Sequence, residues 1–419
     1  MFRFWDYPLF ERTILTARKG GINDFFVVTG YEGEKVRLYL DKLSQRTNTN
    51  ITPIINEEWE KGNGISVLKA RNFIKEPFIL LMADHLFDYS ILEGLKKEQI
   101  SKDEIILAVD HNIESNKLVD IDDVTKVLVE DNKITAIGKN ISNYNAYDTG
   151  IFLCSPVLFQ AIEDSFLSTG DSTLSGGIRI LSGNGNAKTF DVQDKYWIDV
   201  DDEKAFSKAE NLLIGNLKKT SDGPVSRYLN RPLSIRLTRL LLNTKIAPNH
   251  ISIFAFILGV MGAGFFFLGG YINLIIGGVL AQIASVIDGC DGEIARLKFK
   301  ASEFGGWFDA VLDRYGDAFL LFGLTYHVYL TDGRFLYIII GFLEIIGTFM
   351  NSYTADKYDG LMQKKLKLGM HYFRIGRDVR TFIILLGALV NQPLSILILI
   401  AFMTNAENVR RVLLLYKNG

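Results

Sequence analysis

The feature that most constrains this chain is a series of long apolar stretches in its second half. Two of them, at 251–270 and 271–287, follow each other directly and contain no charged residue. A membrane-spanning helix needs about 20 apolar residues, and several such stretches in one half of a chain are not typical of a buried soluble core. The sequence therefore predicts an all-α domain of six transmembrane helices. The four further candidates are 307–330, 334–352, 377–391 and 393–409.

Positive charge is distributed unevenly over the segments that connect these stretches. Lysines and arginines gather before the first stretch, after the second, between the fourth and fifth, and after the sixth. Cytoplasmic connections are the ones enriched in these residues. We therefore expect a multi-pass protein of the cell membrane that contacts the lipid bilayer and has both termini in the cytoplasm. The first residues, MFRFWDYPLFER, lack the apolar core of a signal peptide.

Charge and cysteine content exclude several classes of protein. Lysine and arginine number 46 and aspartate and glutamate 48, so the net charge is −2 and the chain is not expected to bind nucleic acid. The two cysteines, Cys154 and Cys290, are too few for a disulfide scaffold or a four-cysteine zinc site.

The first half of the chain alternates apolar segments with amphipathic ones. This alternation is typical of a doubly wound α/β sheet, which binds its ligands at the carboxyl ends of its strands. Asp84 ends one of these strands, so it is a candidate ligand-binding residue, although an exposed turn residue would give the same pattern. The expected strands are 24–31, 77–84 and 105–110, and the expected helices are 9–19, 34–43 and 64–73.

These patterns divide the chain into an α/β domain at 1–217, a linker at 218–245 and a membrane domain at 246–419. If the linker stretch 226–243 is helical, its arginines and its leucines and isoleucines lie on different faces. That composition is typical of a helix at the surface of an anionic membrane. A plain linker helix is the alternative.

Aspartates at the ends of the second and third apolar stretches are the strongest chemical signal. Asp288 and Asp291 are three residues apart and Asp309 and Asp313 are four apart, so each pair shares one helix face. Four carboxylates that meet in a low dielectric need cations, and oxygen ligands select Mg²⁺, Mn²⁺ or Ca²⁺. Two such ions would balance the four charges and suit the displacement of a phosphate group. Salt bridges to neighbouring basic side chains are the alternative.

The full spacing of this region resembles the signature of the CDP-alcohol phosphotransferases. The match runs Asp288-x-x-Asp291-Gly292-x-x-Ala295-Arg296, then eight residues, then Gly305-x-x-x-Asp309-x-x-x-Asp313. The resemblance covers about 225–419. It implies a homodimeric six-helix membrane enzyme in which an acceptor hydroxyl displaces CMP from a CDP-alcohol near the cytoplasmic surface.

The same resemblance assigns roles to single residues. Asp313 would be both a metal ligand and the general base that takes the proton of the acceptor hydroxyl. The ligands of two Mg²⁺ or Mn²⁺ ions would be Asp288, Asp291, Asp309 and Asp313. The residues that line the CDP site would be Gly292, Ala295, Arg296 and Gly305.

Basic residues between the fourth and fifth stretches are candidates for binding an acceptor phosphate. Arg374, Arg377 and Arg380 are three residues apart and share a face if the segment is helical, and Lys357 precedes them. The ordinary positive charge of a cytoplasmic connection explains the same residues equally well.

Four segments of the first half carry a second resemblance: WEKGNGIS at 59–66, LLMADH at 80–85, DTGIF at 148–152 and WIDVD at 197–201. They look like the sugar-phosphate nucleotidyltransferase fold, and more narrowly like an inositol-1-phosphate cytidylyltransferase domain. This resemblance implies CTP binding, with a divalent ion held by Asp84 and by one of Asp199 or Asp201. The residues that contact the nucleotide would be Gly62, Asn63, Gly64 and Ser66.

The chain departs from this second family at its start. The family's fold opens with a strand and a Gly-rich loop that wraps the triphosphate, whereas here no glycine precedes Gly20. Such a loop supplies backbone N–H donors and cations to the phosphates. Either that segment is missing from this chain, or the domain has lost nucleotidyl transfer.

The two domains together resemble the bifunctional inositol-1-phosphate cytidylyltransferase/di-myo-inositol phosphate phosphate synthase family. The resemblance implies that the first domain makes CDP-inositol from CTP and inositol 1-phosphate. The second would transfer inositol phosphate to another inositol 1-phosphate and release CMP. The alternatives are a phospholipid synthase with a lipid acceptor and an inactive first domain, and a cation transporter without enzymatic activity.

Overall fold

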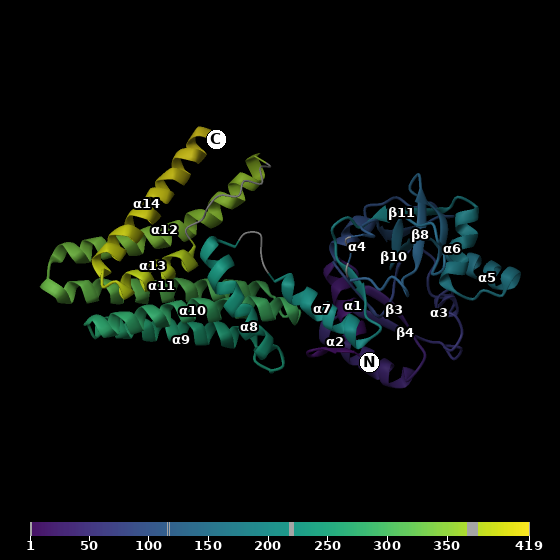
Figure 1. Cartoon of the computed structure of the whole chain (residues 1–419), viewed down its shortest axis with the longest axis horizontal. Helices are drawn as coiled ribbons and strands as arrows, with labels where there is room; N and C mark the ends of the chain where they lie inside the picture. The colour runs from purple at the N-terminus through teal and green to yellow at the C-terminus, as the bar shows by residue number, and fades with distance from the viewer. Residues whose placement is uncertain (1, 115, 117, 218–221, 367–375, 419) are drawn as a thin grey trace. The chain divides into compact units, whose positions relative to one another are not determined.

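The computed structural model (Figure 1) describes residues 2–114, 116, 118–217, 222–366 and 376–418, without the side chains of 356–366 and 418. The chain consists of two compact units, Met1–Leu212 and Leu213–Gly419.

The first unit is built on a six-stranded sheet with the order β5-β10-β7-β11-β9-β8. Strand β10 is antiparallel to β5 and to β7, whereas β11 is parallel to β7. The expected α/β sheet is therefore mixed rather than all parallel. Its strands are β5 (Phe78–Leu81), β7 (Ile105–Asp110), β8 (Lys126–Glu130), β9 (Lys133–Gly138), β10 (Ala146–Cys154) and β11 (Ala187–Asp191).

Helices cover both faces of this sheet, and the alternation of side chains along β7 explains why. Leu107 and its neighbours two residues away pack with side chains of α5 and α6, whereas Ile106 and Ala108 pack with side chains of α1 and α4. All six residues of β7 are buried, as a strand between two helical layers requires. The covering helices are α1 (Leu9–Lys19), α4 (Ser90–Leu95), α5 (Val157–Thr169) and α6 (Leu174–Gly183).

Short strand pairs and helices complete the first unit. The β1–β2 and β6–β12 pairs are antiparallel, and the β3–β4 pair is parallel. These elements are β1 (Arg3–Phe4), β2 (Tyr7–Pro8), β3 (Asp24–Thr29), β4 (Asn50–Ile55), β6 (His85–Phe87), β12 (Trp197–Asp199), α2 (Gly33–Thr47), α3 (Asn63–Leu68) and α7 (Glu203–Gly215).

Strand β3 lies in the layer of the main sheet without pairing to it. Phe25 of β3 packs against the cluster that contains Ile79 and Leu81 of β5, and Val28 packs against the cluster on the opposite face, with Leu80. Both strands therefore contribute to the core on both sides of one layer. Among the described strands, β5 pairs only with β10, and β3 pairs only with β4.

The second unit is helical. Helix α10 packs against α9, α13 and α8, and α12 packs against α11 and α14. The expected helix at 226–243 is present as a π-helical turn followed by α8. The elements are η1 (Ser226–Asn230), α8 (Arg231–Leu242), α9 (Pro248–Phe267), α10 (Tyr271–Leu297), α11 (Glu303–Asp332), α12 (Phe335–Leu366), α13 (Arg377–Leu389) and α14 (Pro393–Asn418).

Helices lie where the six apolar stretches were expected, but they do not all have the length and composition of a membrane span. Among the described residues, three helices are long and apolar enough: α9, α10 and the part of α12 at Phe335–Ala355. Helix α13 has 13 residues, which is about 20 Å at 1.5 Å per residue. That is shorter than the roughly 30 Å of a hydrocarbon core. The structure thus supports three of the six expected spans and does not confirm the count of six.

A close contact between α9 and α11 depends on a glycine, which gives a first prediction. A Cβ atom at Gly323 would lie 2.8 Å from the backbone carbonyl oxygen of Ala263. We expect Gly323→Ala to lower the melting temperature of the protein in detergent, because overpacking costs about 1–3 kcal/mol. Gly264→Ala is the matched control, since a Cβ there meets no heavy atom within 4 Å. Equal melting temperatures for the two variants would contradict this packing.

Candidate active site

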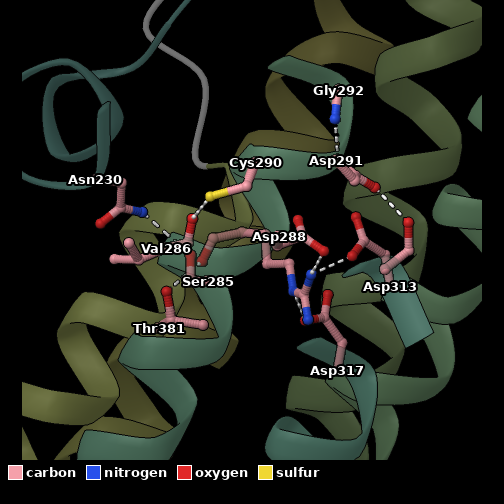
Figure 2. A network of polar contacts seen from close by, with 12 residues as sticks. Asn230, Ser285, Val286, Asp288, Cys290, Asp291, Gly292, Asp313, Asp317 and Thr381 are labelled. Carbon is pink, nitrogen blue, oxygen red and sulfur yellow. Dashed lines mark hydrogen bonds and ion pairs between the residues drawn. The ribbon is translucent and has the colours of Figure 1, made fainter. Parts of the chain in front are cut away.

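The carboxylates of α10 and α11 converge in the second unit. Ligand oxygens of Asp288, Asp309 and Asp313 all lie within 4.8 Å of one another. Asp288 lies in the C-terminal part of α10 and the other two lie one turn apart on α11, so the four-residue spacing places both on one face. Asp288 and Asp313 point toward the same space as Asp317 (Figure 2).

These side chains have the chemistry of a site for hard divalent cations. All the donors are carboxylate oxygens, which Mg²⁺ and Mn²⁺ prefer. The Oδ1 atom of Asp309 is buried and has no hydrogen-bond partner among the described residues. A buried polar atom without a partner is costly, and a bound cation would satisfy it.

Asp291 is held beside this group by two donors. Its Oδ2 accepts a hydrogen bond from the Ser252 hydroxyl of α9, and its Oδ1 accepts one from the Gly292 backbone N–H. Figure 2 shows the bond from Gly292. Asp291 is therefore fixed in orientation, as the partners of metal ligands usually ensure.

The hydroxyl on Asp291 gives a second prediction. We expect Ser252→Ala to weaken Mn²⁺ binding by about 10–100-fold, the usual effect of losing a partner of a metal ligand. Electron paramagnetic resonance of the free ion measures this directly in detergent-purified protein. Ser395→Ala, an exposed serine at the start of α14, is the control. Unchanged Mn²⁺ affinity in Ser252→Ala would contradict this role of the Ser252 hydroxyl.

Two arginines of α13 lie among the aspartates. Arg377 contacts Asp313, and its Nη1 is 3.2 Å from Asp288 Oδ1 and its Nε 3.5 Å from Asp317 Oδ1. Arg380 donates to Asp317 Oδ2 at 2.5 Å, and both side chains are almost fully buried. The sequence left open whether these arginines bind an acceptor phosphate, and in the structure they contact carboxylates. Arg374 lies outside the described residues, as does the side chain of Lys357.

The residues expected to line a CDP site lie on the same helices. A Cβ at Gly292 would be 3.3 Å from Nη1 of Arg296, so this glycine leaves room for the guanidinium. The Nη2 atom of Arg296 is buried and makes no hydrogen bond to described residues. Gly305 is in the first turn of α11, where its N–H donates to the Ser302 hydroxyl at 3.0 Å. Ala295 is buried.

A buried cluster of charged and polar residues joins α8 to α10 next to the aspartates. The sequence did not reveal this cluster. Glu293 is fully buried and accepts hydrogen bonds from Arg231 at 2.7 Å, Ser234 at 2.6 Å and Thr238 at 2.7 Å, all on α8. Arg231 also binds Asp222 through Nε at 2.9 Å and Nη2 at 3.1 Å. Nothing in the sequence separates Glu293 from the other charged residues in the C-terminal part of α10.

The first unit contains a separate cavity of about 480 Å³. The β6–β12 pairing sets Asp199 opposite His85, next to Asp84. The Nδ1 atom of His85 lies 2.9 Å from Asp84 Oδ1 and 3.6 Å from Asp199 Oδ1. Acidic, amide and basic residues of the cavity lining include Asn63, Asp84, Asp199, Asp201, Lys139, Lys204 and Lys208.

Electrostatics distinguish the two aspartates of this cavity. Burial raises the pKa of Asp199 to about 7, and the negative charges of Asp84 and Asp201 act in the same direction. The nearby His85 opposes this rise. Burial also acts on Asp84, but its hydrogen bond with His85 prevails and lowers the pKa of that carboxyl. A divalent cation between the two would relieve the crowding of negative charge.

Three of the four residues expected to contact the nucleotide have contacts within the protein instead. Cβ atoms at Gly62 and Gly64 would lie 2.7 Å and 2.6 Å from the backbone oxygen of Ser172. The Ser66 hydroxyl accepts a hydrogen bond from Asn56 at 3.0 Å. Of the four residues, the structure brings only Asn63 to the cavity lining.

Known proteins resemble the chain over most of its length. The family model described as CDP-alcohol phosphatidyltransferase matches residues 245–406. A protein of Rubrobacter xylanophilus named bifunctional IPC transferase and DIPP synthase is 32% identical over 97% of this chain and 89% of its own length. The chain belongs to this bifunctional family. It is therefore an enzyme with a CDP-alcohol phosphotransferase domain, and that domain includes every aspartate of the candidate site.

A second member of the bifunctional family, from Aquifex aeolicus, is 30% identical over 98% of this chain and 91% of its own length. A solved structure of the inositol-1-phosphate CTP transferase from T. maritima covers 50% of this chain and 84% of its own, with 27% identity and a TM-score of 0.44.

Proposed function

We propose that the second unit transfers inositol phosphate from CDP-inositol to inositol 1-phosphate and releases CMP. The observation that carries the proposal is the convergence of Asp288, Asp309 and Asp313, whose ligand oxygens lie within 4.8 Å of one another. The match to the CDP-alcohol family and the bifunctional relatives support this donor and acceptor.

In this reaction a hydroxyl of the acceptor attacks the phosphorus that carries the inositol of the donor. The bond from that phosphorus to the oxygen of CMP breaks, and CMP leaves with the bonding pair. Asp313 takes the hydroxyl proton, the role of a positioned general base. Two Mg²⁺ or Mn²⁺ ions held by Asp288, Asp291, Asp309 and Asp313 would stabilise the charge on the phosphates. Arg296 and the space beside Gly292 would receive the CDP moiety.

We infer that the first unit takes part in the synthesis of CDP-inositol from CTP and inositol 1-phosphate. Its cavity offers Asp84 and Asp199 or Asp201 for a divalent ion, with Asn63 beside them.

The lipid bilayer enters the proposal as the location of the reaction. The apolar helices α9, α10 and α12 support a multi-pass membrane protein, and the charge of the connections supports cytoplasmic termini. Homodimerisation belongs to the same proposal, because it is implied by the family resemblance.

Product analysis separates the proposed function from its alternatives. Detergent-purified protein receives CDP-inositol and Mg²⁺ with either inositol 1-phosphate or diacylglycerol in the micelles, and phosphorus NMR follows the products. The proposal predicts a water-soluble product with one phosphodiester and one phosphomonoester signal of equal intensity, formed only with inositol 1-phosphate. A lipid-soluble product would establish a phospholipid synthase, and the absence of any product with bound Mg²⁺ would favour a cation-binding protein without this activity.

A further inference from the structure

Arg377 makes its contacts with the carboxylates that form the candidate metal site. Its Nη1 is shared between Asp313 and Asp288, at 3.2 Å from Asp288 Oδ1. Its side chain is only 12% exposed. Gly316 makes room for the guanidinium, since a Cβ there would lie 3.3 Å from Nη2. Arg377 is thus placed closely against two of the three aspartates whose oxygens could hold an ion.

The guanidinium of Arg377 and a divalent cation compete for these carboxylate oxygens. Each carboxylate has a limited number of lone-pair directions, and Arg377 Nη1 already occupies one on Asp288 and one on Asp313. Like charges a few ångströms apart repel strongly where the dielectric constant is low. Binding of a divalent ion to Asp288 and Asp313 therefore opposes the contacts of Arg377.

The two arginines of α13 differ in how firmly they are held. Arg380 is 3% exposed and donates to Asp317 Oδ2 at 2.5 Å, on a carboxylate outside the group that could hold the ion. Arg377 is the first residue of α13, its Nε lies 3.5 Å from Asp317, and that buried Nε makes no hydrogen bond to described residues. An ion at Asp288 and Asp313 would thus act on Arg377 and leave the pair of Arg380 with Asp317 intact.

We propose that divalent cations release Arg377 from Asp288 and Asp313, and that the released guanidinium binds the phosphate of the acceptor. This proposal rests on the proposed function for the identity of the acceptor. A guanidinium presents paired N–H donors that match phosphate oxygens. Arg377 is then both a counter-charge of the aspartates and a phosphate ligand, and the metal decides between the two.

Coupled binding is the consequence. If the metal frees the group that binds phosphate, the metal and inositol 1-phosphate must each raise the affinity of the other by the same factor. We expect that factor to be at least about 5, the lower end of typical coupling between sites. In Arg377→Gln it should fall to about 1, because neither ligand depends on the guanidinium.

Arginine footprinting tests the release directly. Full-length protein in detergent is treated with phenylglyoxal, and mass spectrometry measures the modification rates at Arg377 and Arg380 separately. The proposal predicts that Mg²⁺ raises the rate at Arg377 several-fold and that inositol 1-phosphate then lowers it, while the rate at Arg380 stays constant. An unchanged or lower rate at Arg377 with Mg²⁺ would overturn the proposal.

A binding titration completes the test. The dissociation constant of Mn²⁺ is measured with and without inositol 1-phosphate in the wild-type protein, in Arg377→Gln and in Arg334→Gln, whose exposed arginine lies at the start of α12. Wild type and Arg334→Gln should show the coupling, and Arg377→Gln should lose it. Coupling that persists in Arg377→Gln would overturn the proposal even if CMP release confirms the proposed function. Release of Arg377 by Mg²⁺ without any effect of inositol 1-phosphate would instead overturn the acceptor, both here and in the proposed function.

Discussion

Replacing Asp313 with asparagine should lower the rate of CMP release by about 10²–10⁴-fold, the usual contribution of a general base. Asparagine preserves the shape of the side chain but cannot take the proton of the acceptor hydroxyl. It also removes one charge from the group formed with Asp288 and Asp309. The measurement is kcat for CMP release from CDP-inositol, with inositol 1-phosphate and Mg²⁺ at saturation.

The control for this variant is Asp332→Asn at the far end of the same helix, α11. Asp332 is partly exposed and pairs with Arg334, so its replacement should leave kcat unchanged. A normal kcat for Asp313→Asn would show that another group takes the proton, even though the family assignment would stand. Saturation with Mg²⁺ is essential, because it separates the loss of the base from weaker metal binding.

Replacing Glu293 with alanine should destabilise the second unit by about 3–5 kcal/mol, as expected when one partner of a buried ion pair is removed. The fully buried Glu293 carboxylate satisfies the donors of Arg231, Ser234 and Thr238. Without it, these three donors lose their shared acceptor, and α8 loses these three contacts with α10. Thermal unfolding in detergent, followed by circular dichroism, measures the loss.

Two further variants make this result specific. Glu293→Gln retains acceptor and donor atoms of similar shape, so its loss of stability should be smaller. Glu303→Ala removes an exposed glutamate from the first turn of α11 and should change the melting temperature little. Equal melting temperatures for Glu293→Ala and Glu303→Ala would contradict the role of the cluster.

Local patterns in the sequence predicted much of the fold. The apolar segment at 105–110 is β7, and the segment at 9–19 is α1, because burial on both faces and helical periodicity are properties of neighbouring residues. The antiparallel course of β10 was not predicted. Strand direction depends on pairing between segments far apart in the chain, here with β5 and β7, and a sequence pattern of period two does not encode it.

In the second unit, too, local sequence patterns predicted only part of the structure. The apolar stretches predicted the helices, but the count of six spans was inferred from apolar stretches of different lengths. Helix α13 is too short, and α11 and α14 are long enough but not apolar enough, so length and composition support only three spans among the described residues.

The parts of the candidate site that depend on residue spacing within one helix were predicted. The four-residue spacing of Asp309 and Asp313 predicted a shared helix face, and their oxygens do converge with those of Asp288. The contacts of Arg377 were not predicted, because its partner Asp313 is 64 residues away in sequence. The bond from Arg231 to Glu293 spans 62 residues and was missed for the same reason.

The reaction that we propose for the carboxylate site of the second unit is the transfer of inositol phosphate to inositol 1-phosphate. Its most direct test is CMP release by the purified protein in detergent with CDP-inositol and Mg²⁺, measured with and without inositol 1-phosphate. We expect CMP release that requires both Mg²⁺ and inositol 1-phosphate and that stops when EDTA removes the metal. No CMP release from this pair of substrates, or release that continues undiminished in EDTA, would contradict it.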